Sequence, residues 1–379
     1  MTQTSKTELL KEVKARYLKA TVEEKTKILD EFCNNANYNR KYATRILQAR
    51  HRYKTGTKTA PKKYLGKPME IIIKVWELLN YPCGARLKPM LLPMAESLVS
   101  HNEITELNES IKEQLSQIGS ATLDRYLKKE KQTRRLGRGR SLTRHGSLLK
   151  SSVPIRITNW DTAIIGFMEM DTVAHCGDVL SGEFIYSLDM VEIATGWSEQ
   201  VAVMGKGEEG IVKAIEAIKQ GLPFGLKGLD SDTGREFVNW HMVRWCKENN
   251  LSFTRSRPYY KNDNAYVEQK NYTHIRKWLG YRRYDNVKQL EMINDLYRNE
   301  LRQFNNFFLP VMKIKSKEKV NNSVCKKTYD IAQTPYQRIM KSNQIPPETK
   351  SELQKFYESL NPVKLKETIK AKLKRIIQS

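Results

Sequence analysis

Residues 256–271 read SRPYYKNDNAYVEQKN, and the rest of the chain can be arranged around Glu268 near the end of this stretch. Asp232 lies 36 positions earlier, within the segment DSDTGREF at residues 230–237. Further upstream, an apolar segment, FMEMDTV, carries Asp171 near its middle. A carboxylate inside an apolar strand is costly unless it is paired or binds a cation. Asp171, Asp232 and Glu268 are therefore the first candidates for a functional site.

The segments around these acids predict an α/β domain. We expect strands at residues 167–176, 183–193, 196–204, 225–232 and 251–254, and helices at residues 207–220, 235–250 and 264–280. Three strands in succession, followed by alternating helices and strands, do not match a doubly wound nucleotide-binding fold. The order predicts a ribonuclease-H-like fold, in which a mixed five-stranded sheet carries helices on both faces.

Carboxylates on three different elements can bind divalent metal ions. Mg²⁺ prefers carboxylate oxygens, and two ions roughly 4 Å apart can activate the attacking oxygen and stabilise the leaving oxygen in phosphoryl transfer. We predict that Asp171, Asp232 and Glu268 are catalytic and bind two Mg²⁺ (or Mn²⁺) ions. Two alternatives stay open. Asp230 points to the same side of its strand as Asp232, and Glu169 shares a strand face with Asp171.

Residues 1–56 predict a helix-turn-helix DNA-binding unit. A capping box opens one helix, and a basic helix over residues 40–50 follows an asparagine-rich turn. We expect Tyr42, Ile46 and Ala49 to form the apolar stripe of this second helix. Its candidate DNA contacts are Arg40, Lys41 and Arg45. A solvated basic helix on a structural bundle is the alternative, because helix-turn-helix patterns in one sequence are weak.

Four further segments complete the predicted organisation. They are a second helical DNA-binding unit at residues 64–132, a basic linker at 133–160, the ribonuclease-H-like catalytic core at 161–290, and a C-terminal basic region with helices at 291–379. Two helical basic units in tandem favour bipartite DNA recognition. The alternative for the second unit is that most of its helices only form a core.

Further basic and polar residues are candidate DNA contacts. Arg125 lies on the polar side of the last predicted helix of the second unit. Arg138 and Arg140 belong to a Gly-Arg-Gly-Arg segment, which is thin enough to lie in a minor groove. A solvated linker is the other interpretation of that segment. The residues near Glu268 that could hold the DNA backbone are Arg257, Lys261, Lys270 and Asn271.

Composition limits the class of protein. The 379 residues carry a formal net charge of +24, which favours a polyanionic partner, most commonly nucleic acid. The five cysteines are scattered, so neither a disulfide framework nor a thiolate zinc site is indicated. The sequence contains no long apolar run and no signal-like N-terminal segment. We expect a cytoplasmic, nucleoid-associated protein with no membrane contact.

The segment from about residue 154 to residue 338 resembles the integrase catalytic core shared by bacterial insertion-sequence transposases and retroviral integrases. The family pattern is an aspartate on the first strand, then Asp-Asn-Gly-x-Glu-Phe, then a helical glutamate about thirty-five residues later. Here these positions are Asp171, the run from Asp232 to Phe237, and Glu268. Thr233 replaces the usual Asn, and the His₂Cys₂ zinc module of retroviral integrases is missing, which favours a bacterial-type transposase.

The resemblance implies a ribonuclease-H-like fold, Mg²⁺ or Mn²⁺, and action as a homo-oligomer on paired DNA ends. We therefore expect a transposase that cleaves DNA at the terminal inverted repeats of an insertion sequence. The freed 3′-hydroxyl would then attack target DNA. Two alternatives remain: a nuclease of the same fold that only hydrolyses, and a catalytically silent DNA-binding protein derived from a transposase. Joined DNA products would distinguish the transposase from both alternatives.

Overall fold

The computed structural model describes residues 3–48, 64, 66–105, 107–133, 163–232, 234, 236–256, 265–321 and 324–379. The chain divides into two compact units, Met1–Lys63 and Tyr64–Ser379. Each unit has its own hydrophobic core, and the two are described separately below. In the described part of the chain, no helix is long and apolar enough to cross a membrane.

The first unit is a three-helix bundle. Its helices are α1 (Gln3–Lys19), α2 (Val22–Ala36) and α3 (Arg40–Gln48). The predicted capping box is present, since the backbone N–H of Thr21 donates to Oε2 of Glu24 at 2.8 Å. The predicted apolar stripe of α3 is only partly correct. Ile46 packs against the core, but the buried residues are Ala43 and Leu47, and Tyr42 is 41% exposed; Ala49 lies outside the described residues.

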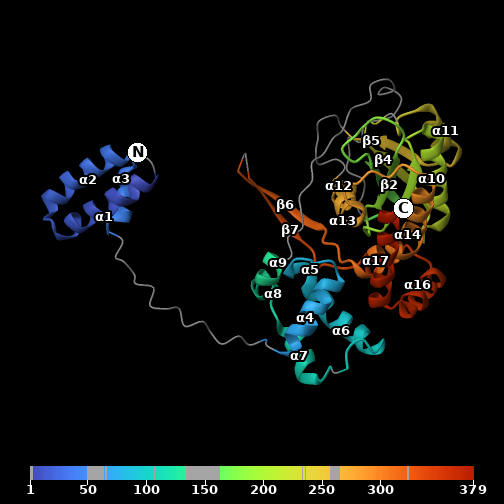
Figure 1. Ribbon diagram of the computed structural model, residues 1–379, viewed down its shortest axis with the longest axis horizontal. Helices are drawn as coiled ribbons and strands as arrows, with labels where there is room; N and C mark the ends of the chain where they lie inside the picture. The colour runs from blue at the N-terminus through green and yellow to red at the C-terminus, as the bar shows by residue number, and fades with distance from the viewer. Residues whose placement is uncertain are drawn as a thin grey trace. The chain divides into compact units, whose positions relative to one another are not determined.

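The second unit begins with a group of short helices (Figure 1). They are α4 (Lys67–Leu78), α5 (Gly84–Leu87), the 3₁₀ turn η1 (Lys88–Met90), α6 (Leu91–Ser100), α7 (Glu109–Gln117), α8 (Ser120–Tyr126) and α9 (Lys128–Thr133). α5 packs closely on α8, and the backbone N–H of Gly84 donates to Oδ1 of Asp124 at 3.1 Å.

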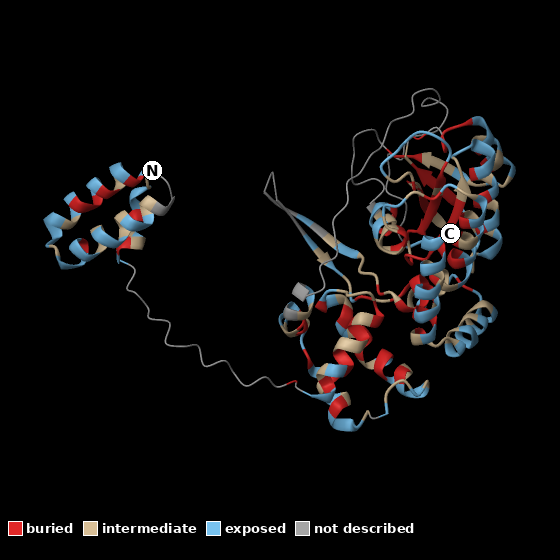
Figure 2. Cartoon of the chain, in the orientation of Figure 1, coloured by how far each residue is buried: buried red, intermediate tan, exposed pale blue. Residues whose placement is uncertain are grey.

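A five-stranded sheet forms the centre of the second unit. Its strands are β1 (Phe167–Ala174), β2 (Ile185–Glu192), β3 (Ser198–Met204), β4 (Gly228–Ser231) and β5 (Ser252–Arg255). The spatial order is β3-β2-β1-β4-β5. β1, β2 and β3 pair antiparallel, whereas β4 is parallel to both β1 and β5. This mixed topology is the predicted ribonuclease-H-like arrangement, and the strands are largely buried (Figure 2).

Helices cover both faces of the sheet. They are α10 (Glu208–Gly221), α11 (Trp240–Glu248), α12 (Ala265–Lys270), the π-helical turn η2 (Asn271–Arg276), α13 (Lys277–Leu279) and α14 (Val287–Leu296). Side chains alternate along β1. Met168 and Met170 pack in the core that includes residues of α10 and α11, and Glu169 and Asp171 face α12. The strand therefore presents two carboxylates to one helix.

The C-terminal region completes the unit. It contains the π-helical turns η3 (Tyr297–Leu301) and η4 (Phe304–Phe308), strands β6 (Ile314–Asn321) and β7 (Val324–Tyr329), and helices α15 (Pro335–Lys341), α16 (Pro347–Ser359) and α17 (Pro362–Gln378). β6 and β7 form a separate two-stranded antiparallel sheet.

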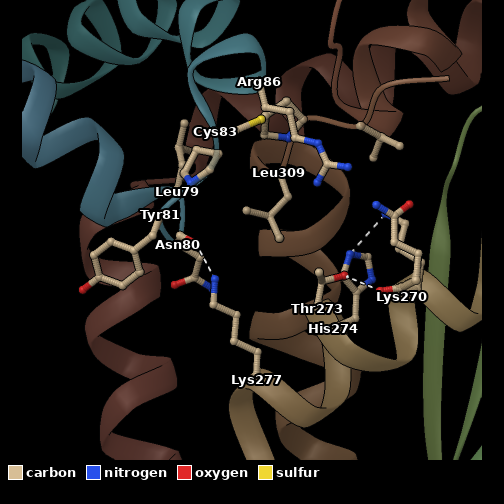
Figure 3. A pocket seen from close by; sticks show the side chains of 14 residues that line it. Leu79, Asn80, Tyr81, Cys83, Arg86, Lys270, Thr273, His274, Lys277 and Leu309 are labelled. Carbon is tan, nitrogen blue, oxygen red and sulfur yellow. Dashed lines mark hydrogen bonds between the residues drawn. The ribbon is translucent and has the colours of Figure 1, made fainter. Parts of the chain in front are cut away.

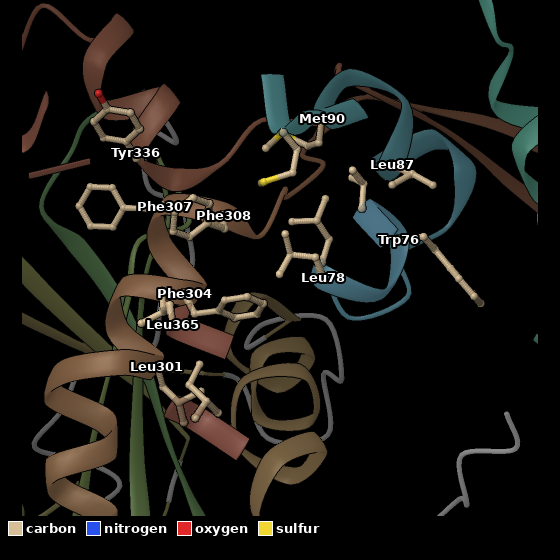
Figure 4. Close-up of a cluster of buried hydrophobic side chains, with 14 of the residues drawn as sticks. Trp76, Leu78, Leu87, Met90, Leu301, Phe304, Phe307, Phe308, Tyr336 and Leu365 are labelled. Atoms are coloured by element: carbon tan, nitrogen blue, oxygen red, sulfur yellow. The ribbon is translucent and has the colours of Figure 1, made fainter. Parts of the chain in front are cut away.

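The early helices and the C-terminal region share one hydrophobic core with part of the sheet. Trp76 and Leu87 from the early helices belong to the same cluster as Phe304, Phe308 and Leu365 (Figure 4). Polar contacts reinforce this packing. Lys366 on α17 donates from Nζ to the carbonyl of Leu78, at the C-terminal end of α4. The predicted segments 64–132, 161–290 and 291–379 are thus packed together in one compact unit.

Candidate active site

Asp171 lies on the central strand of the sheet and is half-buried. Its Oδ1 accepts the backbone N–H of Thr172 at 2.7 Å, and its Oδ2 accepts Nδ2 of Asn271 at 2.6 Å. The first contact is local to β1, but the second comes from η2, directly after α12. Asp171 is therefore held between its own strand and the helix that carries Glu268.

Asp232 immediately follows β4, the parallel neighbour of β1. Met170 is in register with Ser231, so the next residue on each strand, Asp171 and Asp232, lies at the same edge of the sheet. Oδ1 of Asp232 accepts the backbone N–H of Gly234 at 2.8 Å. Burial, followed by the negative charge of Asp232, raises the pKa of Asp171 to about 8. Two carboxylates in this arrangement resist simultaneous ionisation unless a cation joins them.

Glu169 holds the start of α12. Its side chain is fully buried, and its Oε2 accepts the backbone N–H groups of Tyr266 at 3.0 Å and Val267 at 3.3 Å. These N–H groups belong to the first turn of the helix, where no intrahelical acceptor is available. Together with Asn271 on Asp171, this contact ties the helix to β1 at two points. Glu169, a rival metal ligand in the sequence, is thus committed to α12.

The third predicted ligand is placed differently from the first two. Glu268 lies in the first turn of α12 with an exposed side chain, three residues before Asn271. Residues three apart on a helix share a face, so Glu268 lies on the side of the helix that reaches Asp171. Across the described ranges, no three His, Cys, Asp or Glu side chains gather closely enough to hold a metal ion. The structure brings Asp171 and Asp232 together, and the role of Glu268 stays a prediction.

The remaining rival, Asp230, is inside the sheet. It is fully buried in β4, and Thr254 on β5 donates from Oγ1 to its Oδ1 at 2.5 Å. Its register partner on β1 is Glu169, one step further from the edge than the Asp171 and Asp232 pair. Asp232 lies beyond the end of the strand and is therefore better placed than Asp230 to act as a metal ligand.

Two carboxylates near the pair were missed in the sequence. Asp189 on β2 is the register partner of Asp171, and Gln200 donates from Nε2 to its Oδ1 at 2.8 Å. Burial raises the pKa of Asp189 to about 7. Asp189 carries the same sequence signal as Asp171, an acid inside an apolar predicted strand, but its closeness to Asp171 depends on the pairing register of β1 and β2.

Glu236 is the second missed carboxylate, and it belongs to the DSDTGREF segment. Its Oε1 accepts Oγ1 of Thr172 at 3.1 Å, and Nζ of Lys206 lies 3.5 Å away. The backbone of Gly234 passes between two acids. A Cβ added there would lie 2.7 Å from Oε2 of Glu236 and 2.9 Å from Oδ1 of Asp232. A side chain here would shift one of these flexible carboxylates, so glycine leaves both in place.

The donor atoms suit a hard divalent cation. Oδ1 of Asn271 is buried and has no hydrogen-bond partner among the described residues, and it belongs to the side chain that contacts Asp171. Two aspartate carboxylates and an amide oxygen are the oxygen ligands that Mg²⁺ and Mn²⁺ prefer. The residues present therefore fit such an ion.

The predicted DNA contacts fall into three groups. Arg40, Lys41 and Arg45 are exposed on α3, where Arg40 also pairs with Asp30, and Arg125 is exposed on α8. Two others contact neighbouring residues: Asn271 contacts Asp171, and Lys270 is buried with Nζ 3.2 Å from Nε2 of His274. Their DNA contacts stay predictions. Arg138, Arg140, Arg257 and Lys261 lie outside the described residues.

Comparisons with known proteins gave the following. No family model matches the chain. The "Uncharacterized protein y4rM" of Sinorhizobium fredii (strain NBRC 101917 / NGR234) is 32% identical over 326 residues, which are 85% of this chain and 92% of that protein. A solved catalytic core domain of BIV integrase aligns with 50% of this chain and 98% of its own, at 16% identity and a TM-score of 0.29. The fold assignment rests on the strand order and not on this weak likeness.

Proposed function

The chain belongs to the protein family that includes protein y4rM of Sinorhizobium fredii, and we propose that this member is a transposase. It would cleave DNA at the ends of an insertion sequence and transfer the freed strand into target DNA. The observation that carries the proposal is the pair of Asp171 and Asp232 at one edge of the sheet, with Asn271 from the Glu268 helix bonded to Asp171.

Asp171, Asp232 and Glu268 would hold Mg²⁺ or Mn²⁺, which when bound supplies Lewis-acid stabilisation of the charge on the attacked phosphate. Asn271 orients the Asp171 carboxylate through its 2.6 Å hydrogen bond. Glu169 fixes the first turn of α12 and with it the backbone of Glu268. These contacts set the geometry before DNA binds, which is how an active site lowers the cost of orienting groups.

Two reactions with the same in-line geometry would follow one another at this site. Water attacks the phosphodiester at the element end, the P–O bond to the 3′ oxygen breaks, and a 3′-hydroxyl is released. That hydroxyl then attacks a target phosphodiester, forming a new P–O bond and releasing a target 3′-hydroxyl. Both steps exchange one phosphate ester bond, so one set of carboxylates can serve both.

Basic side chains outside the site support the same proposal. The net charge of +24 favours phosphate binding over the whole molecule. On α3, the exposed Arg40, Lys41 and Arg45 form the basic side of a helix whose apolar side is Ala43 and Leu47. We propose that this helix reads the terminal inverted repeats and that two or more copies of the chain act on paired ends.

The test uses labelled DNA fragments that end in the inverted repeats flanking the gene, a plasmid target and Mg²⁺. Wild type is compared with Glu268→Gln and with Glu248→Gln, an exposed glutamate on α11 that serves as the matched control. We expect cleaved and joined products from wild type and from the control, and at least a hundredfold less from Glu268→Gln (about 3 kcal/mol).

The other outcomes identify the alternatives. Cleavage without joined products indicates a nuclease that only hydrolyses. Tight binding to the repeats with no Mg²⁺-dependent product indicates a DNA-binding protein derived from a transposase. Full strand transfer by Glu268→Gln contradicts the assignment of Glu268 as the third ligand.

A further inference from the structure

A cavity of about 270 Å³ lies beside α12, on another face of the helix from the one that reaches Asp171. One wall is formed by residues 79–83 and by Arg86 of α5. The opposite wall contains Lys270, His274 and Lys277, which repeat at helical spacing along α12, η2 and α13. Figure 3 shows these side chains converging on the cavity from the two walls.

The cavity gathers positive charge without negative charge. Arg86, Lys270 and Lys277 line it, and none of the described residues that line it is acidic. Within the described part of the chain, the Arg86 guanidinium has no hydrogen bond and no ion pair. An arginine has five N–H donors in a planar fork and cannot lose its charge at neutral pH. Its donors are therefore available to a ligand.

The two lysines are only partly satisfied by the protein. Nζ of Lys270 contacts Nε2 of His274 at 3.2 Å, and Nδ1 of that ring contacts Oγ of Ser198 at 2.9 Å. Nζ of Lys277 donates to the backbone carbonyl of Asn80. These acceptors are neutral, so no carboxylate is hydrogen-bonded to either ammonium group within the described residues.

Such a cluster is electrostatically unfavourable when the cavity is empty. Burial lowers the pKa of Lys277 to about 8. Lys270 is itself buried and lines the same cavity as Arg86. Burial also lowers the pKa of His274, which leaves the ring neutral. A bound anion would offset both the desolvation and the mutual repulsion.

We infer that this cavity binds a phosphate group, with Arg86 as a bidentate donor and Lys270 and Lys277 as flanking charges. Arginine forks match the oxygens of phosphate in geometry, and lysines act as point charges. The volume is near the lower end of small-ligand pockets, about 300 Å³, so it fits a phosphate with an attached sugar. The phosphate belongs either to a DNA backbone or to a free phosphorylated compound.

The position of the site gives it a consequence for α12. A phosphate bound there would contact the segment that follows α4 and, at the same time, the helix that carries Glu268. It would hold that helix against the early helices. Binding at this site is independent of the proposed chemistry, because it requires neither Asp171 nor Glu268.

The test is calorimetric titration of the full chain with inorganic pyrophosphate, without divalent metal and at constant ionic strength. Wild type is compared with Arg86→Gln and with Lys88→Gln, the same loss of charge two residues away at an exposed position outside the cavity. We expect one site per chain in wild type and in Lys88→Gln, and about tenfold weaker binding in Arg86→Gln. Equal binding by Arg86→Gln and Lys88→Gln overturns the inference.

Two further arms make the result decisive. Arg86→Lys keeps the charge and should recover part of the affinity that Arg86→Gln loses. This variant also helps to recognise a loss that is caused only by misfolding of Arg86→Gln. If both variants are folded and Arg86→Lys recovers nothing, the result supports the bidentate role of Arg86. A 16-base-pair duplex is then added. Displacement of pyrophosphate identifies a DNA backbone phosphate as the ligand, and retention identifies a free phosphorylated compound. Glu268→Gln should bind pyrophosphate as wild type does, even if the proposed transposase activity fails.

Discussion

At the scale of one residue, the raised pKa of Asp171 makes a prediction about stability. Its pKa is raised by burial and by Asp232 from 3.8 to about 8, so folding without metal binds a proton between roughly pH 4 and pH 8. A raised folded-state pKa gives stability that is complete below pH 4 and is lost as the pH rises toward 8. In metal-free buffer, the free energy of unfolding should therefore fall over this range.

The Asp171→Asn variant isolates this contribution, because Asp189, with its own pKa raised to about 7, changes stability in the same direction in both proteins. One pKa unit corresponds to about 1.4 kcal/mol, and because the site is partly open to solvent we expect a wild-type loss of about 2 kcal/mol beyond that of the variant. Urea unfolding at pH 5 and pH 8 measures it. Mg²⁺ added at pH 8 should raise the free energy of unfolding of the wild-type protein but not that of Asp171→Asn. Parallel pH profiles would contradict the prediction.

At the same scale, the sequence predicts which residues are unusual better than it predicts which residues they contact. Asp171 and Asp232 stand out because a polar residue in an apolar strand and the Asp-x-Gly-x-Glu spacing are visible in the sequence itself. The contacts of Glu169 could not be predicted, because they depend on tertiary packing. Tyr266 lies 97 positions from Glu169, and no local pattern specifies that contact.

At the scale of elements, the attachment of α12 to β1 depends on Glu169. Glu169→Ala removes the acceptor of two first-turn N–H groups in a buried place, and we expect about 2 kcal/mol of destabilisation. The amides of Tyr266 and Val267 should exchange faster with solvent, and kcat should fall while DNA affinity is unchanged. Glu169→Gln keeps an acceptor oxygen and should lose less. Unchanged exchange at these two amides in Glu169→Ala would show that the helix is held by other contacts.

The close contact between α5 and α8 leads to a second prediction at this scale, about the stability of glycine variants. A Cβ at Gly84 would lie 2.1 Å from the backbone oxygen of Ser120, and backbone cannot give way as a flexible side chain does. Gly84→Ala should cost about 2–3 kcal/mol. Gly210→Ala on α10 meets nothing within 4 Å and should be neutral or stabilising by up to about 1 kcal/mol. Thermal unfolding of both variants measures the difference, and similar melting temperatures would contradict it.

At the scale of the whole molecule, the two compact units make a prediction about truncation. The three-helix bundle has a core of its own, and residues 64–379 contain the other two clusters complete. A fragment of residues 64–379 should therefore unfold cooperatively and keep salt-sensitive DNA binding. It should lose its preference for the terminal repeats, measured against a random duplex in gel-shift titrations. An unfolded fragment, or one with undiminished preference, would contradict the proposed division of roles.

The general architecture could be predicted because the order of elements restricts how strands connect. Three neighbouring strands followed by strand–helix alternation leave few arrangements for a five-stranded sheet, and β3-β2-β1-β4-β5 is one of them. The shared core of the early helices and the C-terminal region could not be predicted. Trp76 and Leu365 read as ordinary apolar residues of separate amphipathic helices, and only packing puts them in one cluster.

The parallel pairing of β1 with β4 has a consequence for how the chain acquires its structure. β1 and β2 are joined by a short connection, whereas β2, β3 and α10 lie between β1 and β4 in the sequence. Long-range parallel pairing closes late, because loop entropy is lost before any contact is gained. Asp171 and Asp232 should therefore meet late in folding, so that the proposed active site would assemble only after the antiparallel strands have paired. Pulsed hydrogen exchange during refolding would test this order, with β1 and β2 amides protected before those of β4 and β5.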